Sequence, residues 1–482
     1  MSEDRIGIRT ADGWSLDEIL VSLVYFVPRG RTPMPDWRER LAYFAARITA
    51  FHHRELDAQS RMTTKICEPF RSRYTTDDLR AGDATFTFLQ TLGEVDRELA
   101  FAQGERSAFP ILLVMSDINW RELDDFFRVR RTGTGAIFDG QIVRGRHVPG
   151  SPSGGSRAAY VPDRGIGWAL VSGDGWRVPH TGSDCVVYHE GVGHAIGLSH
   201  PERPDGSVMG QAQYGGWLHQ TWIDDAQKRA VGWSASARGD RDRDLFSTFT
   251  AVSEPASPSP AHEVAVRMTW PGDARVQCCH VAYQTSLFGS WSEVVLEGDD
   301  AQQSTISLGR FPEPTPVSYR VRATMADGQS AELWGYFQVR ARPEVAPMLP
   351  DDGVPVDEPP VALDLMSRLA TTTIQDRCAL DGPLPDAYTL LAVVTPLDDA
   401  PALAFELPIG GGRVQITLRD ELVPQRPLAL TFTAADRRVV VTCEGVSATH
   451  LAADDVATSS AGLALAPLGG RYRFDCLAVV PR

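Results

Sequence analysis

The sequence predicts a multidomain protein in which an α/β segment is followed by two all-β sandwich domains. Residues 1–245 alternate apolar strand-type runs with helical patterns, whereas 262–342 and 361–482 carry short alternating runs separated by turn residues. Two stretches rich in proline, 246–261 and 343–360, separate these parts, and their composition predicts extended linkers. A chain of 482 residues has room for two to four domains.

In the first segment we expect strands at Val21–Val27, Phe109–Met115 and Ile166–Ser172, because these runs are apolar and are bounded by turn residues. Two helices are expected from apolar residues at helical spacing, the first with Asp36 as its N-cap. Their stripes are Trp37, Leu41, Phe44, Ile48 and Phe51, then Phe88, Leu92, Val95 and Leu99. The stretch 131–162 is rich in Gly, Ser and Arg and is expected to be a loop.

The chemistry is concentrated in the run His-Glu-Gly-Val-Gly-His-Ala-Ile-Gly-Leu-Ser-His-Pro, which begins at His189. It supplies three histidines, His189, His194 and His200, and one carboxylate, Glu190. Zn²⁺ held by three neutral imidazoles keeps a fourth position for water and lowers the pKa of that water. Glu190 directly follows the first histidine, where the general base stands in zinc-peptidase helices. The pattern therefore predicts zinc-assisted hydrolysis.

The spacing of the first two histidines predicts a distorted helix. His189 and His194 are five residues apart, so on a regular α-helix they lie roughly 140° from each other. A single π-turn, with an i to i+5 hydrogen bond, brings both rings to one side. Gly191 and Gly193 are poor helix formers and favour such a distortion. We therefore expect a bulged metal-binding helix.

From the second histidine the pattern reads His194-x-x-Gly197-x-x-His200, in which the glycine is expected to end the helix in the left-handed conformation. With the Ser-Val-Met-Gly that follows, this resembles the metzincin zinc endopeptidases, whose long histidine motif precedes a Met-turn. The proline after the third histidine is most like the serralysin branch. The resemblance implies His189, His194 and His200 as zinc ligands, Glu190 as general base and Met209 as an apolar floor beneath the metal.

Two features depart from the metzincin pattern. The three residues between Glu190 and His194 resemble the zinc helix of dipeptidyl peptidase III, and position 211, where serralysins have tyrosine, is glutamine. We expect Tyr214, or alternatively His219, to hydrogen-bond the oxyanion or to take the fifth metal position.

Two neighbouring segments are assigned from the same resemblance. Thr221–Val231 has a helical pattern and is similar to the closing helix of a metzincin domain. Ile166–Ser172 corresponds to the edge strand on which metzincins pair their extended substrate, and the alternative is an ordinary strand within the sheet.

The two C-terminal segments are predicted to be β-sandwiches. The runs that predict the first are Val264–Trp270, Val281–Gln284 and Tyr319–Ala323, and those that predict the second are Tyr388–Val394, Val414–Leu418, Leu428–Phe432 and Arg438–Thr442. The first resembles a fibronectin type III module and the second a concanavalin or laminin-G jelly roll. For the second, the expected partner is a glycan or a protein surface, and a spacer role is the alternative.

The overall composition limits which partners, cellular locations and disulfide bonds can be expected. The net charge of -15 argues against a nucleic-acid partner, and no apolar run approaches the ~20 residues of a membrane span. The first residues are polar and show no signal peptide, so an extracellular location is suggested only by the resemblance. The 7 cysteines are expected to be reduced thiols, with a Cys67–Cys185 disulfide as the alternative, and Cys185 is expected in the core or beside the metal ligands.

The sequence therefore predicts a zinc-dependent peptidase, more specifically an endopeptidase acting on proteins or peptides. Two alternatives stand beside this interpretation. One is a non-catalytic adhesion or recognition protein that contains zinc. The other is a narrow-specificity aminopeptidase or dipeptidyl peptidase, for which a cleft closed at one end is expected.

Overall fold

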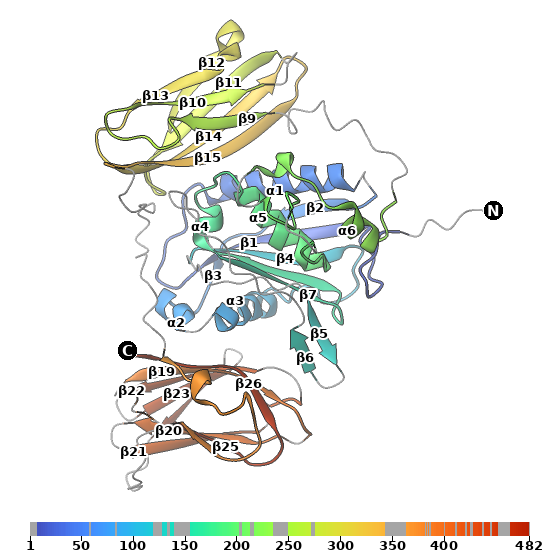
Figure 1. The fold of residues 1–482 in the computed structure, drawn as a ribbon, viewed down its shortest axis with the longest axis vertical. Coiled ribbons are helices and arrows are strands. Elements are labelled where there is room, and N and C mark those ends of the chain that lie inside the picture. The colour runs from blue at the N-terminus through green and yellow to red at the C-terminus, as the bar shows by residue number, and fades with distance from the viewer. Residues whose placement is uncertain are drawn as a thin grey trace, which may run out of the picture.

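The computed structural model shows a multidomain, β-rich chain, as expected (Figure 1). The assignment of the first segment to the metzincins stays a prediction. The described residues are 7–56, 59–81, 84–118, 128–132, 135–138, 155–201, 205–212, 216–234, 249–270, 275–342, 363–380, 382, 384, 387–399, 401–409, 412–419, 422–424, 428–435, 438–443, 446–451 and 463–481.

The first segment is built on a mixed sheet whose strands run in the order β2-β1-β4-β8-β7, with β3 also paired to β1. Pairing is parallel from β2 to β8 and antiparallel between β8 and β7. The strands are β1 (Glu18–Val27), β2 (Arg61–Ile66), β3 (Phe70–Arg71), β4 (Phe109–Ser116), β7 (Ser156–Val161) and β8 (Ile166–Val171). A separate hairpin is formed by β5 (Val129–Thr132) and β6 (Gly135–Phe138).

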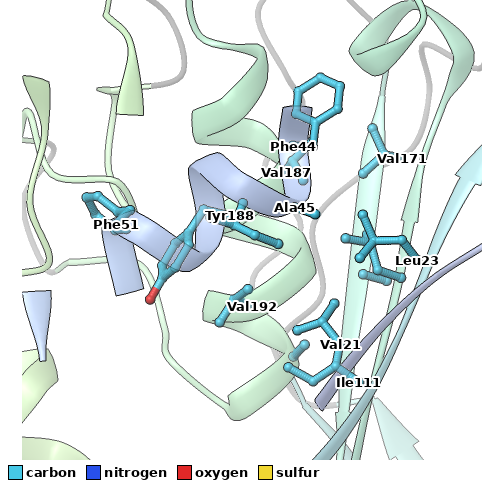
Figure 2. Packing of buried hydrophobic residues seen from close by; sticks show 14 of the residues in the cluster. Val21, Leu23, Phe44, Ala45, Phe51, Ile111, Val171, Val187, Tyr188 and Val192 are labelled. Atoms are coloured by element: carbon cyan, nitrogen blue, oxygen red, sulfur yellow. The ribbon is translucent and has the colours of Figure 1, made fainter. Parts of the chain in front are cut away.

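Helices cover both faces of this sheet, which explains why its central strands are apolar without alternation. Val21 and Leu23 of β1 point to the side of the long helix α1 (Trp37–Glu55) and pack with Phe44 and Tyr188 (Figure 2). Val24 and Phe26 point to the opposite side and pack with α3 (Ala84–Glu98). The other helices are α2 (Thr76–Arg80), α4 (Gly173–Trp176), α5 (Ser183–Tyr188) and α6 (Asp225–Ala230).

The structure departs from three expectations about the first segment. Ile166–Ser172 is not a substrate edge, because β8 lies between β4 and β7, so the alternative of an ordinary strand within the sheet is confirmed. The edge is β7, which falls inside the stretch 131–162 that the composition predicts as loop. The run Ser-Arg-Ala-Ala-Tyr-Val carries too few β-branched residues to stand out from its polar surroundings. The helix expected over Thr221–Val231 is shorter, since α6 begins after the N-cap Asp224.

A sandwich of a three-stranded and a four-stranded sheet follows, with strand orders β13-β10-β9 and β12-β11-β14-β15. Its first strand, β9, lies within the expected linker 246–261, so the linker expectation is wrong for that stretch. The bounds are β9 (Thr250–Glu254), β10 (Glu263–Thr269), β11 (Val276–Gln284), β12 (Ser292–Glu297), β13 (Thr305–Arg310), β14 (Thr315–Met325) and β15 (Ser330–Val339).

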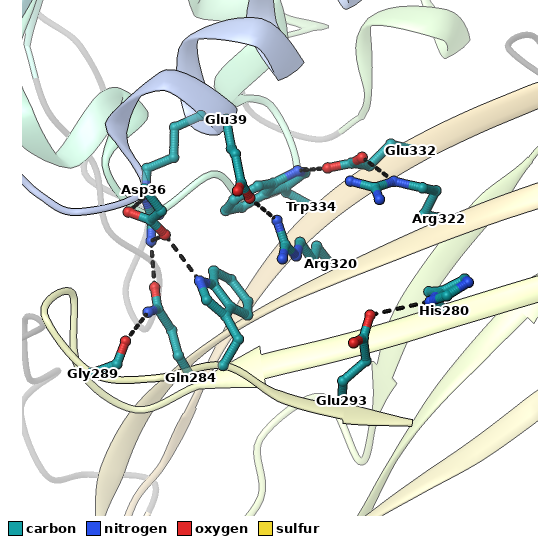
Figure 3. A network of polar contacts seen from close by, with 12 residues as sticks. Asp36, Glu39, His280, Gln284, Gly289, Glu293, Arg320, Arg322, Glu332 and Trp334 are labelled. Atoms are coloured by element: carbon teal, nitrogen blue, oxygen red, sulfur yellow. Dashed lines mark hydrogen bonds and ion pairs between the residues drawn. The ribbon is translucent and has the colours of Figure 1, made fainter. Parts of the chain in front are cut away.

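This sandwich packs on the α1 side of the mixed sheet, where Glu39 of α1 faces Arg320 (Figure 3). Arg40 is central to the contact. The Arg40 guanidinium is fully buried and binds the Asp36 carboxylate through Nε and Nη2, at 2.9 and 2.8 Å. It also donates to the Arg177 carbonyl and to Gln284 of β11. The rings of Trp291 and Trp334 lie within 5.8 and 5.0 Å of it. The sandwich thus shares a buried charged group with α1.

The C-terminal part is a second sandwich, which lies on the α3 side of the mixed sheet (Figure 1). Its larger sheet has the order β16-β26-β19-β22-β23-β24, with β17 on β26, and its smaller sheet the order β18-β25-β20-β21. The strands are β16 (Leu363–Asp364), β17 (Thr373–Ile374), β18 (Cys378–Leu380), β19 (Tyr388–Pro396), β20 (Leu403–Ile409), β21 (Gly412–Leu418), β22 (Leu428–Ala435), β23 (Arg438–Cys443), β24 (Val446–Leu451), β25 (Leu463–Pro467) and β26 (Tyr472–Pro481). The expected linker 343–360 lies outside the described residues.

In the described part of the chain five cysteines are unpaired and no helix suits a membrane span. Cys67, Cys185, Cys278, Cys279 and Cys378 are free thiols, so the alternative Cys67–Cys185 disulfide is wrong. Among the described helices, none combines the length and the apolar character that a bilayer crossing requires.

Replacing Arg40 with alanine is expected to lower the free energy of unfolding by about 3–5 kcal/mol, because it leaves the Asp36 carboxylate buried without its cation. Arg38→Ala is the matched control, since Arg38 is half-exposed on the same helix and pairs with Glu68 at the surface. Its effect should stay within about 1 kcal/mol. Denaturant unfolding of the three proteins measures both values, and equal losses would contradict a buried role for Arg40.

Candidate metal centre

The helix that carries the first two histidines contains the predicted π-turn. α5 runs into a π-helical segment, His189–Gly193, in which the N–H of His194 donates to the carbonyl of His189. The i to i+5 bond adds one residue to the turn and so brings both imidazoles to the same side. The prediction of a bulged helix is confirmed.

The two glycines of the π-turn allow close packing beneath it. A Cβ on Gly193 would lie 2.2 Å from Sδ of Met209, and a Cβ on Gly191 would lie 2.9 Å from the side chain of Leu113. Met209 is fully buried against the metal helix, close to the position expected for the Met-turn methionine. Its role as the floor of the metal site stays a prediction. The contact explains why position 193 has no side chain.

The chain after the π-turn reverses as the sequence predicts. Gly197 has a φ of +93°, the left-handed conformation that favours glycine, and it ends a short 3₁₀ turn over His194–Ile196. The reversal places His200, which is half-buried, opposite the other two imidazoles.

The three imidazoles meet through the same ring atom. Nε2 of His189 lies 2.8 Å from Nε2 of His194 and 3.1 Å from Nε2 of His200, and the remaining pair is 3.3 Å apart. Ligand atoms at ~2.1 Å from a tetrahedral zinc ion stand about 3.4 Å from one another. The three nitrogens therefore have nearly the spacing that a shared metal ion requires.

The tautomers of two rings follow from their other nitrogen. Nδ1 of His189 lies 2.8 Å from the carbonyl of Val208, and Nδ1 of His194 lies 2.7 Å from the carbonyl of Leu198. Because a carbonyl only accepts, each Nδ1 carries the proton and each Nε2 presents a lone pair. Converging lone pairs repel unless a cation lies between them. The donor set thus fits a metal ion, and neutral imidazoles at this spacing suit zinc.

Glu190 stands beside this group on the π-turn and is held from the edge strand. The hydroxyl of Ser156, the first residue of β7, donates to Oε1 of Glu190 over 3.1 Å. Both residues are buried. The sequence did not single out Ser156, because residue 156 falls in the stretch predicted as loop.

The loop that contains Met209 is fixed by a series of polar contacts from α1. The N–H of Val208 donates to the carbonyl of Trp222 over 2.8 Å. Arg54 donates to the carbonyl of Thr221, and Glu55 accepts from the N–H of Ile223. The metal ligand His189 is thereby connected to α1 through backbone groups.

The residues expected to assist the reaction are placed as follows. Tyr214 lies outside the described residues. His219 has its Nδ1 2.8 Å from Nη2 of Arg47 on α1, and it does not belong to the three-histidine group; its alternative role stays a prediction. Burial, with Arg47 and Arg54 nearby, lowers the pKa of His219 to about 2. Cys185 is a core thiol whose pKa burial raises.

Most of the three-histidine group is buried in this conformation, and His200 is its partly exposed member. His189, Glu190 and His194 are each 0% exposed, and all six residues of β7 are buried. Among the described residues β7 pairs with β8, and a single bridge from Arg128 to Tyr160 occupies the far end of its other edge.

Comparisons with known proteins add little. No family profile and no curated protein matches the chain. Solved structures that resemble parts of it include sheep galectin-11 in complex with glycerol, at 10% identity over 22% of this chain and 99% of that one, with a TM-score of 0.17. Domains LG4-5 of the mouse laminin alpha1 chain match at 11% identity over 49% of this chain and 78% of that one, with a TM-score of 0.15. Likeness of this size carries no argument, so a glycan ligand stays a prediction.

The packing of the π-turn predicts that Gly193→Ala disturbs the metal centre. The new methyl group must displace Met209, so we expect a loss of about 1–3 kcal/mol in stability and weaker zinc binding. Gly93→Ala in α3 is the control, because a Cβ there meets nothing within 4 Å. It should instead stabilise the protein by about 0.5–1 kcal/mol. Thermal unfolding and zinc titration of both variants provide the comparison.

The convergence of the Nε2 atoms predicts one zinc ion per chain. Zinc should raise the unfolding temperature, since an ion that binds only the folded state stabilises it. His194→Ala should weaken zinc binding by more than the ~100-fold upper value for loss of an outer hydrogen-bond partner. His53→Ala, an exposed histidine at the end of α1, should leave it unchanged. Equal zinc affinity in all three proteins would refute the ligand assignment.

Proposed function

We propose that this protein is a zinc-dependent peptidase whose first segment is a metzincin-like domain, with two β-sandwiches as accessory modules. The observation that carries the proposal is the meeting of three Nε2 atoms, two of them with their lone pairs directed inward, and Glu190 next to the first of these histidines in the chain. The mixed sheet with one antiparallel edge strand, and a metal helix packed on one of its faces, supports the same assignment.

In the proposed mechanism the chain supplies three ligands and a base. When bound, zinc supplies Lewis acidity, which lowers the pKa of water and polarises a peptide carbonyl. Glu190 takes a proton from the attacking water and passes it to the leaving amine. The burial of Glu190 excludes other water and strengthens its interaction with the reacting atoms.

The proposed substrate is an extended peptide that pairs with β7. Edge pairing needs only main-chain hydrogen bonds, so it suits many sequences. Ser156, which contacts Glu190, lies at one end of this edge, and the bridge between Arg128 and Tyr160 occupies the other end. This closed end favours the narrow-specificity exopeptidase as a second candidate within the same chemistry.

The non-catalytic alternative is favoured by the burial of the metal ligands. A structural zinc ion takes a protein side chain as its fourth ligand, whereas a hydrolytic one keeps water there. X-ray absorption spectroscopy of the zinc-loaded protein distinguishes the two. A water or hydroxide oxygen as fourth ligand supports the peptidase.

Replacing Glu190 with glutamine should abolish peptide hydrolysis and retain zinc. Losing the general base is expected to lower kcat by about 100- to 10,000-fold, because the amide cannot take the proton. Cleavage of casein and of a peptide library, together with zinc content, is compared between wild type, Glu190→Gln and the surface control Glu68→Gln. Full activity of Glu190→Gln would refute its role, and inactivity of all three with bound zinc would favour the recognition protein.

A further inference from the structure

The carboxylate proposed as the base is in contact with the strand proposed to receive the substrate. Ser156 Oγ lies 3.1 Å from Glu190 Oε1, and the donor is the hydroxyl because the carboxylate only accepts. Ser156 is 7% exposed and Glu190 0%. The two residues are separated by 34 positions in the sequence, so the contact exists only in the folded sheet.

The sheet fixes the position of this hydroxyl. Ser156 is paired with Val171 of β8, and the N–H of Ser172 donates to the carbonyl of Gly155 over 3.0 Å. The backbone on each side of Ser156 is therefore part of an interstrand ladder. Because this backbone is paired on both sides, the hydroxyl of Ser156 is held in a nearly fixed position, unlike that of a serine on a loop.

We infer that Ser156 is a positioning residue for Glu190, and this inference rests on the proposed peptidase function. A glutamate side chain has three rotatable bonds, and a general base must lie within about 2.6–3.2 Å of the proton that it removes. One hydrogen bond to Oε1 fixes the rotation of the carboxylate plane. The same hydrogen bond links Glu190 to β7, so one strand would position both the paired substrate and the group that transfers the proton.

A purely structural role is the alternative, in which Ser156 only satisfies a buried carboxylate. The two roles differ in what the loss of the hydroxyl changes. A positioning role lowers kcat and leaves KM and zinc affinity unchanged, and the loss vanishes once Glu190 is itself replaced. If the role is only structural, Ser156→Ala lowers stability, and this loss is the same in the wild-type and Glu190→Gln backgrounds.

The experiment compares wild type, Ser156→Ala, Ser156→Thr, Glu190→Gln and the double variant Ser156→Ala/Glu190→Gln in the zinc-loaded full chain. With a cleavable peptide, Ser156→Ala should lower kcat by about 10- to 100-fold, the range that corresponds to one charge-assisted hydrogen bond. Threonine keeps the hydroxyl and suits a strand, so it should restore most of kcat. In the Glu190→Gln background the alanine should cause no further loss.

Ser172→Ala is the matched control. Ser172 is fully buried at the neighbouring end of β8, and its hydroxyl has no hydrogen-bond partner among the described residues. Its removal should leave kcat unchanged. A comparable fall in kcat for Ser172→Ala, or a change in KM alone for Ser156→Ala, would overturn the inference.

A binding measurement separates this inference from the proposed function. Acetohydroxamic acid chelates zinc and carries N–H and O–H donors for a neighbouring carboxylate. Ser156→Ala should weaken its binding at least fivefold in the presence of Glu190 and have no effect in Glu190→Gln. If the Ser156→Ala effect on hydroxamate binding depends on Glu190 but no peptide is cleaved, the peptidase function is refuted and the positioning role is supported. If the protein cleaves peptides but the Ser156→Ala effects on kcat and on hydroxamate binding do not depend on Glu190, the peptidase is supported and the positioning role is refuted. A chain that binds no zinc would refute both proposals.

Discussion

The metal centre depends on one constraint, the need for three imidazole nitrogens to share a point. His189 and His194 are five positions apart, and only an i to i+5 turn lets both Nε2 atoms reach this point. Glycine at 193 then lets the turn lie against Met209 without a side chain in between. The carbonyls of Val208 and Leu198 fix the tautomers, so the backbone of two loops determines which nitrogens face the ion.

Around this centre the fold acts as a rigid support. The central strands of the mixed sheet are buried on both faces, and the metal helix packs on the face that α1 also covers (Figure 2). Glu190, the proposed general base, is held from the edge of the same sheet. One sheet therefore positions the three histidines, the proposed base and the proposed substrate strand. This suits a reaction whose rate depends on sub-ångström placement of the reacting groups.

The sequence predicted those features that follow from local geometry. The π-turn followed from helix periodicity, and the left-handed Gly197 from its place in the motif. Some strands of both sandwiches, such as β10, β14 and β22, were recognisable from their apolar runs, whereas others, such as β9 and β25, were not. Features that depend on distant partners were not predictable. β7 lacks a local strand signal and is defined by its pairing with β8, and nothing near Arg40 indicates a partner 244 residues away in Gln284.

The contact between Arg40 and Gln284 also sets an order of events during synthesis. Helix α1 emerges from the ribosome early, yet its buried guanidinium gains its amide partner from β11, and Trp334 arrives later still with β15. A chain that has only just completed the three histidines thus still presents an unfinished surface on α1. Until β11 and β15 have been translated, Arg40 lacks the contacts that bury it in the folded chain, so the first segment completes its packing only together with the sandwich.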